Sequence, residues 1–512
     1  MARVPNGSEA ETFPVKKLDM EAGRGLVVLG RRLAARYGIS PGSIVGVGCR
    51  GRVQGGVAVV SDTLGGDDFL ALTADLVERL GGCDSVKLYP LEFPPSFRYL
   101  KMRLEGEEIE ESGYKKLISD IVAGLYDEAQ IAAFLVSQVY QPLGGDELAY
   151  LIRAMVETGE VIKFPVPVHD VHSIGGVPGN SKVALIVVPT VAAAGLLIPK
   201  TSSRAITSPA GTADTMEVLA RVAFTPEEII EIVSKTHGAI LWGGALRLAP
   251  ADDIFVRVER RLGIDPRSQM VASILAKKLA MNVSRLVIDI PFGRGAKVES
   301  EEEATELASI FLSQAQRLGI TMRIALTYGD EPIGYGVGPA LEAREALETL
   351  ISGGEKAAPG LVEKACSLAG LVLALGGAAT AETGYEHACS ILRSGASYRK
   401  MREIIEAQEG DPDVKPEDIK LAGNSFTVTA PRDGVVTTVS NTAVSLAARA
   451  AGAPDDRGAG ILLHAKTGSR VRRGDPLFTV YASSRGRLRE ALSIMESMRG
   501  MVVEGMLVRT LP

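Results

Sequence analysis

The sequence contains few cysteines, and none of them are spaced as metal ligands usually are. Its 512 residues include four, with no C-x-x-C pair: Cys49, Cys83, Cys366 and Cys389. This spacing argues against a structural zinc site and against a disulfide framework, and it favours a reducing cytosol. The opening residues, M-A-R-V-P-N-G-S-E-A-E, lack the apolar stretch of a signal peptide. We therefore expect a cytoplasmic protein.

A strong charge of either sign is also missing. The chain has 56 Lys and Arg residues against 62 Asp and Glu residues, which gives a small net charge of −6. Without a basic excess, nothing favours a nucleic acid as partner. One run, 183–199, is almost wholly apolar and has the length of a short membrane span. Because it contains Pro189, Thr190 and Gly195, we expect a buried helix of an α/β core there and no membrane partner.

Apolar residues, by contrast, are plentiful. They make up 46% of the chain, and the mean hydropathy is +0.15. These values are typical of a well-packed globular protein rather than a disordered one. Because 512 residues are too many for one core, we expect two to four domains.

The pattern along the chain predicts an α/β multidomain protein. Residues 1–94 alternate short strands with Gly turns and predict a small N-terminal β-rich domain, an extension suited to assembly or to a lid. Helical spacing of apolar residues across 95–165 predicts an all-helical domain, to which 250–284 should return. Strands, loops and helices alternate over 166–420, which predicts a central, mainly parallel α/β domain. Short strands with Gly turns then predict a C-terminal α+β domain over 421–512.

The strongest functional signal lies in residues 170–217. They read D-V-H-S-I-G-G-V-P-G-N-S-K, an apolar run, and P-K-T-S-S-R-A-I-T-S-P-A-G-T-A-D-T-M-E. Gly lets the backbone approach an anion, while Ser, Thr and backbone N–H groups supply donors. The first loop follows a predicted strand at 166–170 and precedes a helix expected from Ser181 to Gly195, where the helix dipole favours phosphate. One such loop could be a surface turn, but two of the same chemistry favour an oxyanion site.

These residues resemble the thymidine and pyrimidine-nucleoside phosphorylase family. D-x-H-S-x-G-G-V carries the general likeness, and K-T-S-S-R-A-I-T-S-x-A-G-T-A-D is similar to its archaeal branch, which acts on nucleoside monophosphates. The resemblance implies a pentosyltransferase that converts AMP and phosphate into adenine and ribose 1,5-bisphosphate in AMP catabolism, with CMP and UMP as possible further substrates. It also implies that the enzyme needs no metal or cofactor, and that inorganic phosphate is a co-substrate. A homodimer or larger homo-oligomer is implied as well.

The resemblance assigns substrate contacts to both loops. The nucleotide is expected to contact Gly176, Ser203, Arg204, Ala205, Ile206, Thr207, Ser208 and Thr212. Ser173 and Ser202 match residues that hold inorganic phosphate. The nucleoside branch has a lysine where this chain has Val171, so the cation must come from elsewhere. Three lysines are candidates, and Lys297, which the resemblance favours as a substrate contact, heads them: Lys297, Lys182 and Lys200.

Phosphorolysis also needs a proton donor to the leaving base. The resemblance assigns this role to Asp265 and a contact with the base to Ser273. Asp followed by Pro is also a common pair at a helix start, and a helix N-terminus favours the carboxylate over the acid. His172 is the rival donor, because it titrates near neutral pH without help. Lys277 matches a base-reading lysine, but adenine lacks the carbonyl group that this lysine would contact.

Two other functions stay open. A pyrimidine-nucleoside phosphorylase is the nearest alternative, although S-R-A-I-T-S and the N-terminal extension argue against it. A nucleotide-binding regulator without catalysis is an alternative of another class, and Val171 keeps it open. If the chain is an enzyme, the helix 265–279 and the phosphate loops should lie on different bodies that close on the substrate. Hinges are then expected at three crossings: 164–168, 248–251 and 282–285.

Overall fold

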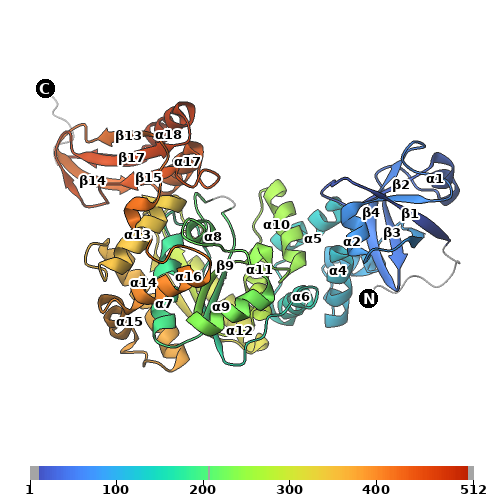
Figure 1. The fold of residues 1–512 in the computed structure, drawn as a ribbon, viewed down its shortest axis with the longest axis horizontal. Helices are drawn as coiled ribbons and strands as arrows, with labels where there is room; N and C mark the ends of the chain where they lie inside the picture. Colours follow the sequence, from blue (N-terminus) through green and yellow to red (C-terminus); the bar gives the residue numbers. More distant parts are fainter. Residues whose placement is uncertain (1–10, 206–207, 506–512) are drawn as a thin grey trace. The chain divides into compact units, whose positions relative to one another are not determined.

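The structure is a computed structural model, and it describes residues 11–205 and 208–505 (Figure 1). The chain divides into two compact units. Unit 1 comprises Met1–Glu160 and Ala249–Ala276, and unit 2 comprises Val161–Leu248 and Lys277–Pro512. Each unit is therefore built from segments that are far apart in the sequence.

Unit 1 begins with a closed six-stranded β-barrel, drawn in blue in Figure 1, with strand order β1-β5-β2-β4-β3-β6. Its pairs are antiparallel except β1 with β5 and β2 with β4. Closure leaves the barrel without an edge strand, and apolar side chains such as Phe13, Val27 and Leu72 fill its core. The barrel elements are β1 (Thr12–Leu18), β2 (Leu26–Leu29), α1 (Arg31–Tyr37), β3 (Ile44–Cys49), β4 (Arg52–Val60), β5 (Leu70–Thr73), α2 (Ala74–Arg79) and β6 (Ser85–Pro90).

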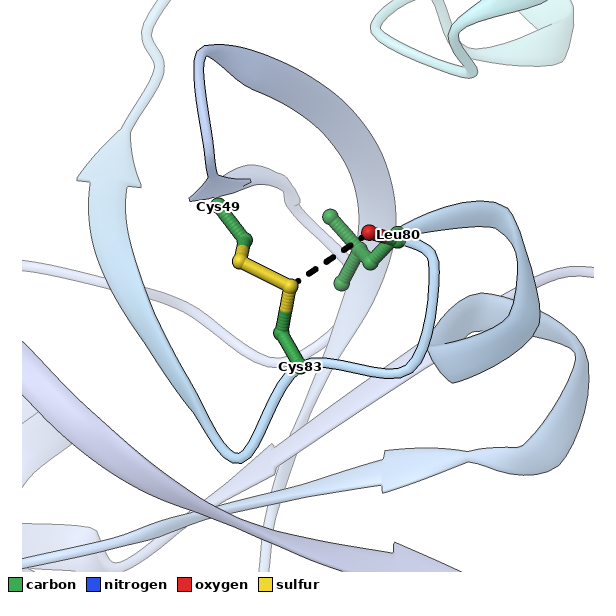
Figure 2. The surroundings of a disulfide bond; sticks show 3 residues. All are labelled: Cys49, Leu80 and Cys83. Atoms are coloured by element: carbon green, nitrogen blue, oxygen red, sulfur yellow. Dashed lines mark hydrogen bonds between the residues drawn. A yellow bond between two sulfur atoms is a disulfide. The ribbon is translucent and has the colours of Figure 1, made fainter.

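The barrel contains a disulfide bond between Cys49 and Cys83 (Figure 2). The expectation that these cysteines form no disulfide was wrong, and the cysteine argument for a reducing cytosol does not hold. Cys49 ends β3 and Cys83 precedes β6, and the antiparallel pairing of β3 with β6 brings the two residues together. Their separation of 34 residues in the sequence carried no information about this pairing. The Cys83 sulfur also lies 3.4 Å from the carbonyl oxygen of Leu80.

The rest of unit 1 is helical. A capping box of Asp127 and Gln130 begins α5, and the Phe134 ring lies 5.7 Å from that of Phe255, which packs α5 against α10. The residues after Leu248 thus join helices from an earlier part of the chain. These helices are α3 (Phe97–Glu105), α4 (Glu111–Val122), α5 (Glu128–Tyr140), α6 (Gly145–Glu157), α10 (Pro250–Leu262) and α11 (Arg267–Ala280), whose last turn belongs to unit 2.

Unit 2 is built on parallel strands. One sheet has the order β11-β10-β7 and a second pairs β8 with β9, all parallel. A single parallel bridge, Val168 to Leu197, connects β7 with β8. The next rung would need an N–H group from Pro199, which has none, so the ladder stops there. The strands are β7 (Val168–Ser173), β8 (Ile198–Ser202), β9 (Gly238–Trp242), β10 (Val283–Phe292) and β11 (Thr321–Tyr328).

Helices pack against these strands around a large apolar core. The apolar run after Lys182 forms the buried helix α7, as expected, and Thr225 with Glu228 forms a capping box at the start of α9. Among the described residues, α14 alone is long and apolar enough to cross a membrane, and its buried residues pack into this core. The helices are α7 (Ser181–Ala193), α8 (Thr212–Met216), α9 (Pro226–Thr236), η1 (Gly243–Ala245), α12 (Glu301–Leu318), α13 (Pro339–Ile351), α14 (Pro359–Gly376), α15 (Gly384–Arg393), α16 (Ala396–Ala407) and η2 (Pro416–Asp418).

The C-terminal part of unit 2 has two antiparallel sheets, with orders β12-β15-β17-β13 and β16-β14-β18. Asn441, at the start of α17, donates to the carbonyl oxygens of Arg294 and Gly329 at 3.1 and 2.7 Å, which attaches this region to the loops after β10 and β11. Its elements are β12 (Gly336–Val337), β13 (Asn424–Thr429), β14 (Gly434–Val439), α17 (Asn441–Ala451), β15 (Gly460–Leu463), β16 (Arg470–Val471), β17 (Pro476–Ala482), α18 (Arg485–Ser497) and β18 (Met501–Glu504).

The disulfide predicts a definite thiol count and a definite stability change. Cys366 and Cys389 are free, so a colorimetric assay in denaturant should find two thiols per chain before reduction and four after it. Substituting both Cys49 and Cys83 by Ala should lower the stability of the barrel by about 3 to 4 kcal/mol, because the bond closes a long loop in the unfolded chain. Four thiols without reduction would contradict the bond.

Candidate active site

The first predicted loop connects β7 to α7 and presents a hydroxyl group. Gly175 and Gly176 adopt φ angles of +81° and +92°, which favour glycine. The Ser173 Oγ accepts hydrogen bonds from the Gly175 N–H at 3.3 Å and from Asn180 Nδ2 at 2.9 Å. A hydroxyl group has two lone pairs and one proton, and both lone pairs are used here. The Ser173 proton is therefore available to an anion.

The loop after β10 contacts this first loop. A Cβ atom placed on Gly176 would lie 2.5 Å from the backbone nitrogen of Lys297, a distance that real Cβ atoms do not tolerate. Lys297 follows β10, which pairs in parallel with β7, so both loops leave the same edge of the sheet. The structure thus brings Gly176 and Lys297 together, as a shared substrate site requires.

The second predicted loop, after β8, folds back onto α8. One carboxylate oxygen of Asp214 accepts from the N–H groups of Ala205 at 2.7 Å and Gly211 at 2.9 Å. Ser208 Oγ donates to the carbonyl oxygen of Ala210, and Thr212 is the first residue of α8. Ser203 is exposed, and Ile206 and Thr207 lie outside the described residues.

Arg204 is already paired with carboxylates. Its guanidinium forms a two-point ion pair with Glu217, one contact of which is 2.7 Å, and lies 4.5 Å from the Trp242 ring. Arg457 approaches the same carboxylate at 2.7 Å. Arg204 holds the pKa of Glu217 below its usual value, so this carboxylate is charged. Two arginines thus converge on one anionic group at the edge of the loop.

Buried ion pairs lie beneath the loops. Lys278 Nζ donates to Asp170 Oδ2 at 2.6 Å and to the Thr201 carbonyl oxygen at 3.2 Å, and so connects β7 with β8. Lys182 was a candidate for the missing cation, but its ammonium group is fully occupied. Its three protons go to Glu345 at 2.5 Å and to two backbone carbonyl groups, which leaves none for a ligand.

His172, the residue before the last one of β7, lies in an environment that keeps its ring neutral. Burial lowers the pKa of His172 well below its usual range, and the nearby ammonium groups of Lys278 and Lys200 lower it further. Its Nδ1 atom is buried and has no hydrogen-bond partner among the described residues. A neutral ring can accept or donate a hydrogen bond, but it has no imidazolium proton to transfer.

The remaining predicted residues belong to the other unit. Asp265 precedes α11 and is exposed, and Ser273 is half-buried on that helix; both lie in unit 1. Ser173, Gly176, the loop after β8 and Lys297 lie in unit 2. The structure thus groups the predicted anion-binding residues in one unit and assigns the predicted proton donor to the other.

Three parts of the chain match known families. Residues 98–159 match the glycosyl transferase family, helical bundle domain, and residues 166–398 match the glycosyl transferase family, a/b domain. Residues 435–499 match the pyrimidine nucleoside phosphorylase C-terminal domain. The chain is thus a mixed α/β multidomain protein with a helical bundle, an α/β glycosyltransferase domain and a C-terminal domain.

Similarity to whole proteins is more specific. An AMP phosphorylase of Hyperthermus butylicus is 64% identical over 505 residues, which cover 98% of this chain and 100% of the relative. An AMP phosphorylase of Pyrococcus furiosus is 46% identical over 501 residues, which cover 97% of this chain and 99% of the relative. The chain belongs to the AMP phosphorylase family. The resemblance read from the two loops is thereby confirmed.

A solved structure supports the fold of this family. Anthranilate phosphoribosyltransferase (TrpD) from Thermus thermophilus superposes with a TM-score of 0.53 at 20% sequence identity, covering 61% of this chain and 99% of that one. The likeness concerns the fold alone. It agrees with a helical bundle combined with an α/β domain in the AMP phosphorylase family.

Several polar residues near the loops were not found from the sequence. Asp214 and Glu217 lie within the G-T-A-D-T-M-E stretch. An acidic residue shortly after a Gly-Thr pair could have been interpreted as a side chain that hydrogen-bonds the backbone of the loop. Lys278 directly follows Lys277, which was considered as a contact of the base. Helical spacing alone does not reveal that Lys278 contacts Asp170. Arg457 lies in a C-terminal loop, and no sequence feature connects it with Glu217.

The contact between the two loops predicts unequal effects of two glycine substitutions. Gly176→Ala should reduce kcat/KM for the proposed substrate by about 10-fold or more, because the new Cβ displaces Lys297 in addition to straining the backbone. Gly175→Ala is the matched control. It has a similar φ, but no atom lies within 4 Å of its Cβ position, so it carries the strain alone. Equal losses in steady-state assays of both variants would contradict a functional contact.

Proposed function

We propose that the chain catalyses the phosphorolysis of AMP, which yields adenine and ribose 1,5-bisphosphate. Membership of the AMP phosphorylase family carries this proposal. The two donor-rich loops at one edge of the parallel strands support it, because an incoming phosphate and a nucleotide 5′-phosphate each need such donors. CMP and UMP are proposed as further substrates, and the working enzyme as a homodimer or larger homo-oligomer.

The chemistry needs an anion site, a closed environment for the sugar and a proton for the base. Phosphate attacks the anomeric carbon as the bond to adenine breaks, through a transition state with oxocarbenium character. Phosphate is the co-substrate, and the proposed reaction uses no metal or other cofactor. In the proposed scheme Ser173 and Ser202 hold this phosphate, and Gly176 and Lys297 contact the bound nucleotide.

The loop after β8 is proposed to bind the 5′-phosphate of the nucleotide. The proposed contacts are Ser203, Arg204, Ala205, Ile206, Thr207, Ser208 and Thr212. Glu217 holds the Arg204 guanidinium in the same two-point manner in which a phosphate would hold it. A phosphate group can therefore replace Glu217 as the partner of the Arg204 guanidinium, which is already oriented.

Asp265 is proposed as the proton donor and Ser273 as a contact of the base. The neutral state of His172 supports this choice, since the rival donor has no imidazolium proton to transfer. Because Asp265 is exposed, the bound base would have to cover its carboxyl group when the proton is transferred. The proposed acid thus depends on its substrate.

The function is tested by measuring adenine released from AMP with and without phosphate. Release should require phosphate, and kcat/KM for adenosine should be at least about 100-fold lower than for AMP, since adenosine lacks the group that the loop binds. Comparable values for the two substrates would contradict the role of the loop. Activity on thymidine or uridine instead would favour a pyrimidine-nucleoside phosphorylase, and tight AMP binding without turnover would favour a regulator.

Arg204→Ala should lower kcat/KM for AMP more than for adenosine, because it removes a charged donor to the 5′-phosphate. KM for AMP should rise about 10- to 100-fold. Arg221→Ala is a matched control, since Arg221 is also half-exposed, paired with two glutamates and stacked on an aromatic ring, Phe224. Steady-state kinetics with AMP and with adenosine separate the two variants. An equal effect of the two substitutions on AMP would mean that Arg204 has a structural role only.

Asp265→Asn should lower kcat for AMP by about 10²- to 10⁴-fold, the usual contribution of a general acid. Nucleotide affinity, measured by calorimetry with AMP in the absence of phosphate, should change little. Near-normal turnover would move the donor role to His172 and would show that the histidine gains a proton in the complex.

A further inference from the structure

Lys200 is a buried lysine that has no acidic partner among the described residues. Its side chain is buried in the middle of β8, and its ammonium group donates to the Thr201 carbonyl oxygen at 2.8 Å. In residues 11–205 and 208–505 no carboxylate lies within ion-pair distance of it. An ammonium group has three protons, so two remain without a hydrogen bond. Burying an ammonium group without an opposite charge destabilises the fold. Buried groups of this kind are common at binding and catalytic sites.

The other buried lysines of unit 2 are compensated. Lys182 contacts Glu345 at 2.5 Å, Lys278 contacts Asp170 at 2.6 Å, and Lys364 contacts Asp289 at 3.0 Å. Each of these lysines is paired with a carboxylate that is itself buried or nearly so. Lys200 therefore departs from a pattern that the same core follows three times.

The position of Lys200 directs it toward the phosphate loop. The bridge between Val168 and Leu197 sets the register of β7 beside β8. The same offset of residues pairs Val171 with Lys200 and Ser173 with Ser202, although the ladder of hydrogen bonds itself stops at Pro199. Level residues of parallel neighbours project to the same face of a sheet. Lys200 thus lies near the strand ends that carry Ser173 and Ser202, and it is close enough to His172, the residue before Ser173, to lower the pKa of that ring.

Positive charge accumulates at this point. Lys278 donates to the same Thr201 carbonyl oxygen, and in the described part of the chain Asp170 pairs with Lys278 but not with Lys200. Burial and the neighbouring Lys278 lower the pKa of Lys200 to about 7, which shows how unfavourable the uncompensated charge is. An anion placed beside Lys200 would relieve both effects, because it supplies the missing opposite charge.

We propose that Lys200 binds the incoming inorganic phosphate and supplies the cation that is absent at Val171. This role rests on the proposed phosphorolysis. The phosphate oxygens would accept two hydrogen bonds from the ammonium group of Lys200 and one from the hydroxyl group of Ser173. Lys182 cannot take this part, since its three protons are already used, and Lys297 stays with the nucleotide at Gly176. The free enzyme thus holds a buried amine that carries only part of its charge near neutral pH, and the bound co-substrate would stabilise the charged form.

Lys200→Met tests the proposal because methionine keeps the length and apolar stem of lysine without the charge. KM for phosphate at saturating AMP should rise about 10- to 100-fold, the contribution of a charge-assisted hydrogen bond, while KM for AMP should change less than 3-fold. Lys200→Arg should restore part of the affinity for phosphate. An unchanged KM for phosphate would overturn the proposal, and an equal rise in both KM values would assign Lys200 to the nucleotide instead.

Thermal unfolding separates this role from a structural one. Without ligand, Lys200→Met should melt at the same temperature as the wild type or higher, since it removes an uncompensated charge. Lys182→Met, the matched control, should melt lower because it leaves Glu345 buried without its partner. Inorganic phosphate alone should raise the melting temperature of the wild type and of Lys182→Met, but not of Lys200→Met. A lower melting temperature of Lys200→Met with the phosphate effect intact would show a structural lysine.

The two readouts also separate this proposal from the proposed function. If the wild type releases no adenine from AMP, the proposed function fails, and the melting shift with phosphate still reports whether Lys200 binds that anion. If adenine is released but the shift survives in Lys200→Met, the proposed function stands and the role of Lys200 is wrong.

Discussion

Compensation of buried charge is the constraint on which the core of unit 2 depends. Lysines from α7, α11 and α14 reach carboxylates on α13, β7 and β10 in places that water does not enter. A buried pair contributes little net stability by itself, but removing one partner leaves a charge that the interior cannot solvate. These pairs therefore specify how helices and strands meet, because any other arrangement would separate the partners. Lys200 stands out against this background as a charge that the protein alone does not balance.

This core positions the two loops that follow β7 and β8. Lys278 connects Asp170 on β7 with Thr201 on β8, so the two strands that carry the serine residues are fixed relative to one another. The loops that follow them need few further contacts. Asp214 closes the loop after β8 through two backbone N–H groups, and glycines allow the loop after β7 to approach Lys297. A rigid strand end carrying a short polar loop is a common basis for binding an anion, because the donors are positioned before the ligand arrives.

Much of the local structure could be predicted because it depends on neighbours in the sequence. The capping box of Thr225 and Glu228, the helix after Ser300 and the buried helix after Lys182 follow from short-range pattern, and the structure has each of them. The family could also be predicted, since the long motifs around His172 and Arg204 are specific. The disulfide could not, because the pairing of Cys49 with Cys83 arises only when β3 lies beside β6 in the closed barrel.

In the candidate site, too, some features could be predicted from the sequence and others could not. The sequence alone determined which loops carry donors, which strands precede them and which residues resemble those of a known family, because these properties reside in residue types and their spacing. Only the tertiary structure decided the state of each ionisable group. Lys182, Lys200 and Lys278 are alike as residues, yet Lys182 is paired with Glu345, Lys278 is paired with Asp170, and Lys200 has no acidic partner in the described part of the chain. The reason is physical, because the charge and proton affinity of a buried group depend on neighbours brought from distant parts of the chain, and a linear sequence does not state which these are.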